Sequence, residues 1–125
     1  MGKYLDELSR SMEYLGIQDN TVFVGQSVEV AGTAMRNTLL NVDQNKLLEL
    51  PVEEDFQMGL SIGMALSGMV PISIFPRWNF LLLATNQIVN HLNNFKHLTR
   101  LSVAPKVIIR TGIGSIKPLH PGIQH

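Results

Sequence analysis

The sequence lacks several features that would point to particular classes of protein. None of its 125 residues is cysteine, which excludes a disulfide scaffold, a thiolate metal site and a cysteine nucleophile. No apolar run approaches the ~18 residues that a membrane helix needs, because Gly68, Pro71 and Pro76 interrupt the most apolar stretch. The first residues carry both Asp6 and Glu7, which is not the pattern of a signal peptide. We therefore expect one cytoplasmic domain of ordinary size, with no membrane contact.

Charge is also scarce and unevenly distributed. Charged residues make up 16% of the chain, against roughly 25% in a typical domain. Residues 1–55 hold all ten acids and four bases, a net charge of −6, whereas residues 56–125 hold six bases and no acid, a net charge of +6. This asymmetry favours an anionic ligand, an acidic partner or a dipole across the domain. Nucleic acid is disfavoured as a partner, because the six bases are scattered and few aromatics lie between them.

Apolar periodicity predicts helices that alternate with short apolar strands. Helices are expected over residues 3–16, about 53–69 and 80–98, and strands over residues 21–24, 47–50, 70–75 and 106–110. In the last of these helices, an apolar stripe is formed by Leu81, Ala84, Ile88, Leu92 and Phe95. Near-continuous apolar strands joined by helices predict an α/β fold, a three-layer α/β/α domain with a mostly parallel central sheet.

Ligands of open parallel sheets collect outside the carboxyl ends of the strands, so the segments that follow the strands are the candidate site. These segments are residues 25–27, 53–55, 76–80 and 111–114. The sequence contains no P-loop, no GxGxxG motif and no pair of histidine and acid that is typical of a metal site. The candidate site therefore offers a carboxylate, aromatic rings, amides and glycines.

An ordered series of motifs carries a family resemblance over roughly residues 3–125. The run ELPVEEDFQMGLSIGMALSGMVPISIF, then WNF, NQIVN, a strand that ends in Arg110 and a terminal Gln-His resembles the pyrimidine-binding domain of transketolase-like thiamine diphosphate enzymes. Within that family the series is most similar to the β subunit of 2-oxo-acid dehydrogenase first components. The resemblance implies that residues 1–125 are a single pyrimidine-binding domain, without the diphosphate-binding and C-terminal domains of the family. The chain would then be a fragment or one subunit of a split protein.

The resemblance also assigns roles to five residues. Glu54 stands where the family keeps the glutamate that hydrogen-bonds the aminopyrimidine ring, and it would thereby favour the tautomer that forms the reactive ylid. Phe80 matches the aromatic residue that stacks on that ring, and Trp78 and Asn79 match the flanking turn. His125 aligns with a histidine on the substrate side of the cofactor.

The residues by themselves leave other interpretations open. An acid at position 54 also suits the positive end of a helix dipole, as do its two acidic neighbours. Phe80 could be a core residue, and Trp78 could equally be an interface anchor. His91 and His97 are interpreted as structural or interface residues, and His120 as either unimportant or a substrate contact.

Two further features bear on the prediction, a residue that differs from the family pattern and a polar helix face. Gln26 stands where the family commonly has an acid, which weakens or removes a proton relay through that position. The helix at 80–98 has a polar face without acids, which suits a subunit interface because amides bond directionally without the desolvation cost of charge. Its members are Asn86, Gln87, Asn90, His91, Asn93 and Asn94.

The chain is therefore expected to be an enzyme subunit that carries half of the active site. The chain would bind the pyrimidine of thiamine diphosphate, and a diphosphate-binding α-type subunit would bring most of the contacts to Mg²⁺ and diphosphate, in a homo- or hetero-oligomer. The substrate would be a 2-oxo acid or a sugar, and the reaction decarboxylation, oxidative acyl transfer or ketol transfer. The alternative is a non-catalytic interaction or regulatory module that retains the fold.

Overall fold

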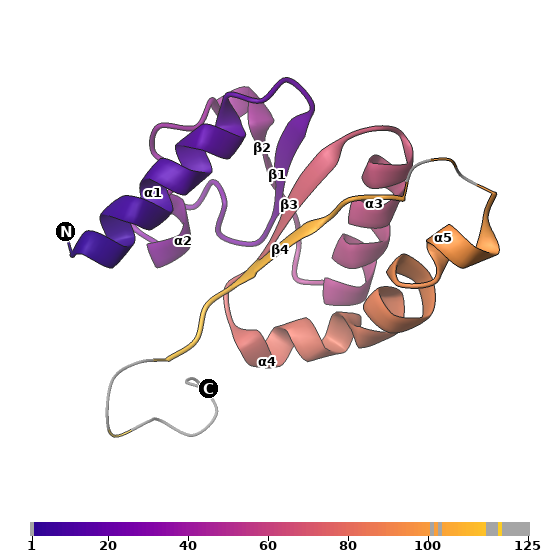
Figure 1. Ribbon diagram of the computed structural model, residues 1–125. Coiled ribbons are helices and arrows are strands. Elements are labelled where there is room, and N and C mark those ends of the chain that lie inside the picture. Colours follow the sequence, from indigo (N-terminus) through magenta and orange to yellow (C-terminus); the bar gives the residue numbers. More distant parts are fainter. Residues whose placement is uncertain (1, 101, 103, 115–117, 119–125) are drawn as a thin grey trace.

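The central sheet has four strands, all parallel. The computed structural model describes residues 2–100, 102, 104–114 and 118. Its strands are β1 (Thr21–Gly25), β2 (Leu47–Glu49), β3 (Val70–Phe75) and β4 (Ile108–Thr111). They lie in the order β2-β1-β3-β4, with β1 in register against both β2 and β3 (Figure 1). The prediction of a parallel sheet is confirmed.

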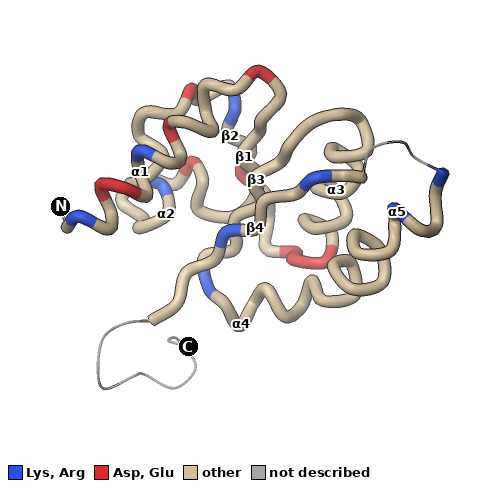
Figure 2. Tube along the Cα trace, in the orientation of Figure 1, with Lys and Arg blue, Asp and Glu red and all other residues tan. Residues whose placement is uncertain are grey.

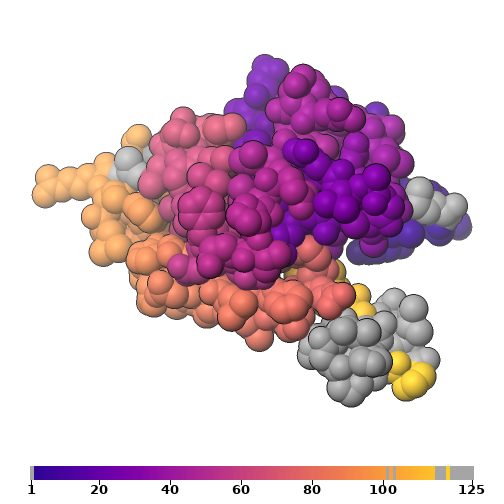
Figure 3. Space-filling view, turned by 180° about the vertical axis from the view of Figure 1, so that it is seen from behind, coloured from indigo at the N-terminus to yellow at the C-terminus, as the bar shows by residue number. Residues whose placement is uncertain are grey.

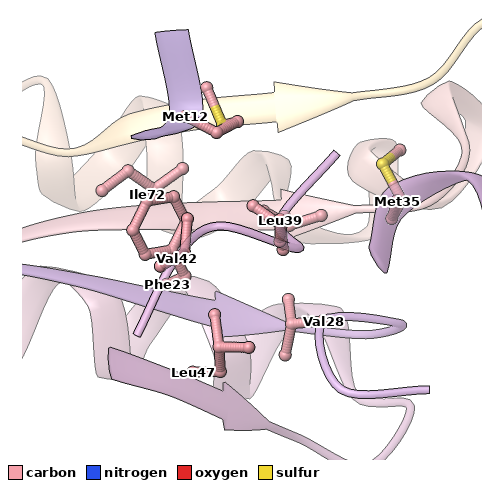
Figure 4. Packing of buried hydrophobic residues seen from close by; sticks show 9 residues of the cluster. Met12, Phe23, Val28, Met35, Leu39, Val42, Leu47 and Ile72 are labelled. Carbon is pink, nitrogen blue, oxygen red and sulfur yellow. The ribbon is translucent and has the colours of Figure 1, made fainter. Parts of the chain in front are cut away.

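One face of the sheet is covered by α1 (Lys3–Gly16) and the short α2 (Ala34–Asn37) (Figure 1). Helix α1 places its apolar side on the sheet, and it ends at Gly16, where an added Cβ would lie 3.3 Å from the Val42 side chain. Figure 4 shows side chains from α1, the sheet and the loops around α2 meeting in this layer. The cluster consists of Met12, Phe23, Val28, Met35, Leu39, Val42, Leu47, Ile72 and Ile74.

The opposite face carries α3 (Glu54–Leu66) and a helical path that runs from Trp78 to Leu98. Its core cluster consists of Met58, Ile62, Phe75, Leu81 and Ala84, with Ile88, Leu92 and Phe95 packed against it. All five residues of the predicted apolar stripe are thus members of this layer. Two helical layers around one sheet confirm the three-layer α/β/α fold (Figure 1).

The expectation of one regular helix over residues 80–98 is wrong. The path consists of α4 (Trp78–Leu81), the 3₁₀ segment η2 (Leu82–Ala84), the π-helix η3 (Gln87–Leu92) and α5 (Phe95–Leu98). The backbone N–H of Asn93 bonds the carbonyl of Ile88, five residues back, and the Asn94 side chain donates to the carbonyls of Val89 and Asn90. Asparagine side chains that compete for backbone carbonyls explain why α-helical bonding does not continue.

Other differences lie at element ends and in the long loop. The helix expected to reach Met69 ends at Leu66, and Gly68 then takes a positive φ of 97°. The last strand begins at Ile108 and not at residue 106. Helix α2 and the 3₁₀ helix η1 (Gln44–Lys46) were not predicted, because each is a single turn too short to show a periodicity. Within the described ranges, no helix is long and apolar enough to cross a membrane.

Candidate functional site

The segments named from the sequence do meet at one edge of the sheet. Because all four strands are parallel, their carboxyl ends share that edge, and residues 26–27, 76–80 and 112–114 follow β1, β3 and β4 there. Helix α3 starts at the same edge, with four residues between the end of β2 and Glu54. The fold thus brings together residues that lie up to about 90 positions apart in the chain.

Glu54 is distinguished from its acidic neighbours by burial. It is the first residue of α3 and is only 4% exposed, whereas Glu53 is exposed and Asp55 is half-buried. A carboxylate that only serves the helix dipole gains nothing from being taken out of water. The burial of Glu54 therefore favours a role for this side chain beyond starting the helix.

The Glu54 carboxyl group has one protein partner within the described part of the chain. The Gln26 Nε2 atom donates to its Oε1 atom at 3.4 Å, and Gln26 itself is 8% exposed. A carboxyl group can make about four hydrogen bonds, so Glu54 keeps capacity for a ligand. This arrangement fits the edge of a nitrogen heterocycle, which Glu54 could bond while Gln26 holds the carboxyl group in place.

Gln26 is the site residue that the sequence analysis undervalued. It was included in the candidate segment 25–27 but given no role beyond a departure from an acid, and the structure shows it in contact with the residue that carries the candidate chemistry. The available signal was its position directly after a predicted strand, at the carboxyl edge. An amide donates to Glu54 without adding a second negative charge to a buried site.

The loop that carries Gln26 depends on Gly25. Gly25 has φ +140°, and a Cβ at this position would lie 2.1 Å from the carbonyl oxygen of Ile74 and 2.8 Å from Gln57 Nε2. The Gln26 backbone N–H and Gln57 Nε2 both donate to that same carbonyl, at 3.3 and 2.9 Å. A glycine is therefore required where the chain turns from β1 toward the helix start.

The carboxylate of Glu49, at the end of β2, fixes the same loop. Its two oxygens accept from three consecutive backbone N–H groups, those of Ser27 and Val28 at 2.7 Å and of Glu29 at 2.9 Å. Ser27 has a positive φ of 62°, which is uncommon for a residue other than glycine. The charge-assisted bonds of Glu49 hold the loop in this conformation.

Glu49→Gln is expected to lower the free energy of unfolding by about 1–3 kcal/mol, because an amide has one acceptor oxygen and its NH₂ group would face a donor. Urea unfolding monitored by circular dichroism measures the change. Asp19→Asn is the matched control, since Asp19 is exposed and no hydrogen bond to its side chain is found in the described residues. Equal midpoints for both variants would contradict the role given to Glu49.

The three residues expected after β3 occupy different environments. Phe80 is half-buried and belongs to neither core cluster, which argues against a purely structural role. Trp78 is 44% exposed, and its backbone N–H donates to the carbonyl of Gly112 at 2.9 Å. The Oδ1 atom of Asn79 is buried and has no hydrogen-bond partner among the residues described.

A cavity of about 300 Å³ opens at this edge, lined in part by Ser27, the residue that follows Gln26. Its walls come from the loop after β1, from α2, from the β3–α4 turn and from the segment after β4. It is lined by Ser27, Thr33, Ala34, Met35, Pro76, Arg77, Trp78, Asn79, Gly112, Ile113 and Gly114. The structure thus brings Trp78 and Asn79 into the cavity, whereas Glu54 and Phe80 do not line it.

The amide face of the helical path is partly used within the chain. Gln87 Nε2 donates to Asp55 Oδ2 at 3.4 Å, and its Oε1 lies 2.7 Å from His91 Nδ1. Asp55 accepts from the amide nitrogen of Gln87, so the amide oxygen of Gln87 is the atom that faces His91. An oxygen only accepts, so this hydrogen bond is assigned to the His91 tautomer with its proton on Nδ1. Gln87 therefore ties η3 to the first turn of α3, next to Glu54. The neighbouring Asn90 and His91 are exposed.

The remaining candidates do not line the cavity, or they lie outside the described residues. Arg110 on β4 is half-buried, and burial lowers the pKa of its guanidinium below the ordinary value while Tyr4 opposes that shift. His97 is exposed on α5. His120 and His125 lie outside the described residues, so the substrate role of His125 stays a prediction. No group of three or more metal-ligating side chains is found in the part of the chain that the structure describes.

Comparison with known proteins confirms the resemblance inferred from the motifs. The chain is 34% identical over 107 residues to the pyruvate dehydrogenase E1 component subunit beta of Cyanidium caldarium, covering 83% of this chain and 32% of that protein. It is 25% identical over 126 residues to the 2-oxoisovalerate dehydrogenase subunit beta of Bacillus subtilis (strain 168), covering 98% and 38%. For the 3-methyl-2-oxobutanoate dehydrogenase subunit beta of Mycobacterium tuberculosis, identity is 28% over 108 residues, covering 81% and 31%.

These similarities concern only part of each relative. The chain spans about a third of the length of the curated relatives it matches. No family model matches the chain. Similarity to the β subunits of 2-oxo-acid dehydrogenases is thus shown, and the activity of the whole protein is a matter for proposal.

Proposed function

Starting from this similarity to 2-oxo-acid dehydrogenase β subunits, we propose that the chain is the pyrimidine-binding half of a thiamine diphosphate-dependent enzyme. Its substrates would be 2-oxo acids or ketoses. The observation that carries the proposal is the buried Glu54 at the start of α3, with Gln26 as its described partner and with unused hydrogen-bonding capacity. When bound, thiamine diphosphate supplies a carbanion that attacks a carbonyl carbon.

The residues of this chain would orient the ring and handle one proton. Glu54 would hold a proton against the ring nitrogen, in a site where a carboxyl group is largely removed from water. Gln26 would keep the carboxyl group oriented through the bond to Oε1. Phe80 would stack on the ring, because it is half-buried and not committed to either core cluster.

We propose that the diphosphate and Mg²⁺ are bound mainly by a partner chain. The supporting surface is the outer side of the helical path from Trp78 to Leu98, which borders one side of the molecule in Figure 3. Three large apolar residues on it, Leu82, Leu83 and Val89, are exposed next to uncharged amides. Exposed apolar side chains in such a setting are typical of an interaction surface.

The proposal is tested by calorimetric titration of thiamine diphosphate and Mg²⁺ into this chain, alone and mixed with a candidate diphosphate-binding chain. Binding in the mixture but not to either chain alone is the expected result, because each chain would hold part of the site. Gel filtration of the same mixture shows whether a complex forms. A complex that binds no cofactor would overturn the proposal.

That last outcome would support the alternative, a non-catalytic interaction or regulatory module with the same fold. The observation that favours the alternative is Gln26, an amide at a position where the family commonly has an acid. A complex that forms, lacks cofactor binding and changes the activity of its partner would identify such a module.

Phe80→Ala is expected to weaken cofactor binding by the complex about two- to tenfold while leaving assembly intact, since ring stacking contributes about 0.5–1.5 kcal/mol. The comparison is between the calorimetric affinity for thiamine diphosphate and the gel-filtration profile of the complex. Leu81→Ala is the contrasting variant, because Leu81 is buried in the core cluster and should lower stability instead. If Phe80→Ala prevents the complex from assembling, Phe80 belongs to the subunit interface and its role in stacking is not supported.

A further inference from the structure

The cavity at the carboxyl edge is positively charged and is separate from the pair of Glu54 and Phe80. Arg77 is the single charged residue among its lining residues. Its guanidinium forms no salt bridge within the described parts of the chain, where the one ion pair joins Arg10 to Glu7. An arginine without a carboxylate partner at a concave site favours a ligand with a negative charge.

The walls of the cavity provide further contacts for a small ligand. Trp78 is 44% exposed and follows Arg77 in the chain, at the turn after β3. Ser27 contributes a hydroxyl group from a loop that Glu49 holds in a strained conformation. Strained residues that the surrounding structure keeps in place are concentrated at binding and catalytic sites.

The position in the fold points in the same direction. The lining comes from the segments that follow β1, β3 and β4, so the cavity lies where ligands of open parallel sheets bind. No residue after Asp55 is acidic, so the turn that carries Arg77 and the segment after β4 add no negative charge to the cavity. In Figure 2, the two basic residues at the left end of α4 and on β4 lie near this edge without an acidic residue between them.

We propose that this cavity is a binding site for the anionic group of a small molecule, a carboxylate or a phosphate, with Arg77 as the residue that binds the charge. Trp78 forms the wall against which the rest of the ligand lies. In the enzyme proposed above, the ligand would be a substrate that carries this charge, and that statement alone rests on the proposed function. The binding site itself does not depend on thiamine diphosphate, because Glu54 and Phe80 do not line it.

The test uses the single tryptophan of the chain, Trp78, as a reporter in the cavity. Acetate, acetamide and inorganic phosphate are titrated separately into the full chain at constant ionic strength. Trp78 is followed by fluorescence and by the NMR shift of its indole N–H. Saturable changes with acetate or phosphate, and none with acetamide, are expected. Acetamide has nearly the shape of acetate without its charge, so this pair isolates the contribution of charge.

Variants connect the response to Arg77. Arg77→Gln is expected to weaken anion binding at least tenfold, and Arg77→Lys to weaken it less, because lysine keeps the charge but loses the planar fork of donors. Lys106→Gln is the control, since Lys106 is also exposed and does not line the cavity. Circular dichroism spectra of all variants establish that the fold is retained.

Each outcome decides the proposal. A response to phosphate alone assigns a phosphorylated ligand, and a response to acetate alone assigns a carboxylate. No saturable change with either anion, an equal response to acetamide, or an unchanged affinity in Arg77→Gln would overturn the proposal. Any of these would leave the thiamine diphosphate proposal standing, because that is tested by titration of the cofactor into the mixed complex.

Discussion

Glu54→Gln is expected to lower the turnover of the reconstituted complex by about 10²–10⁴-fold, the usual contribution of a positioned acid or base. Glutamine keeps the size of the side chain but cannot hold an exchangeable proton between a carboxyl group and the ring nitrogen. Stability should change little, because the described carboxylate makes one hydrogen bond of 3.4 Å and lies at the carboxyl edge rather than in a core cluster. The measurement is steady-state turnover with saturating cofactor, alongside thermal unfolding.

The neighbouring acid provides the control for this experiment. Glu53→Gln removes the same charge one residue earlier, at an exposed position, and should leave turnover within about twofold because surface substitutions have small effects. If turnover falls equally in both variants, the negative charge at the helix start is what matters, and the Glu54 side chain has no specific role. Full turnover in Glu54→Gln would remove Glu54 from the mechanism.

Gly25→Ala is expected to lower the free energy of unfolding by about 3 kcal/mol or more, from backbone strain and overpacking together. The methyl group would lie 2.1 Å from the Ile74 carbonyl oxygen, and φ would have to remain near +140°. Movement of the loop would also break the bond from the Gln26 backbone N–H to that carbonyl. Because Gln26 would move away from Glu54, cofactor binding should weaken even under conditions where the variant is folded.

A second glycine gives the matched control. Gly63 lies in α3 on an exposed position, and no atom lies within 4 Å of the place where its Cβ would be. Gly63→Ala should raise the free energy of unfolding by about 0.5–1 kcal/mol, since alanine is the better helix former. Urea unfolding of both variants measures the two changes. Similar values for Gly25→Ala and Gly63→Ala would contradict the turn geometry described here.

The strands were predictable because their cause is local. Runs such as residues 21–24 and 70–75 are apolar and bounded by glycine or proline, and buried parallel strands need little more than that. The apolar stripe from Leu81 to Phe95 also survived, because its members must face the sheet whichever helical bonding pattern the backbone adopts. The bonding pattern itself was not predictable, since it depends on how Asn94 competes with the backbone for carbonyl oxygens.

The candidate site was predictable in place but not in its contacts. Glu54 and the turn after β3 were found because the carboxyl edge of a parallel sheet is known once the strands are known. The contact between Gln26 and Glu54 joins residues 28 positions apart, and it depends on the turn at Gly25. The three backbone bonds to Glu49 also link β2 to the loop after β1. Such contacts join residues that are distant in the chain, so the periodicity of the sequence does not predict them.

The two proposed surfaces are expected to respond to salt in opposite ways. Leu82, Leu83 and Val89 with their amide neighbours would bind a partner through apolar contact and neutral hydrogen bonds, which added salt does not screen. Arg77 would bind its ligand through charge, and chloride competes for an exposed guanidinium. Raising the ionic strength of the complex should therefore release the small anion while the subunits remain associated.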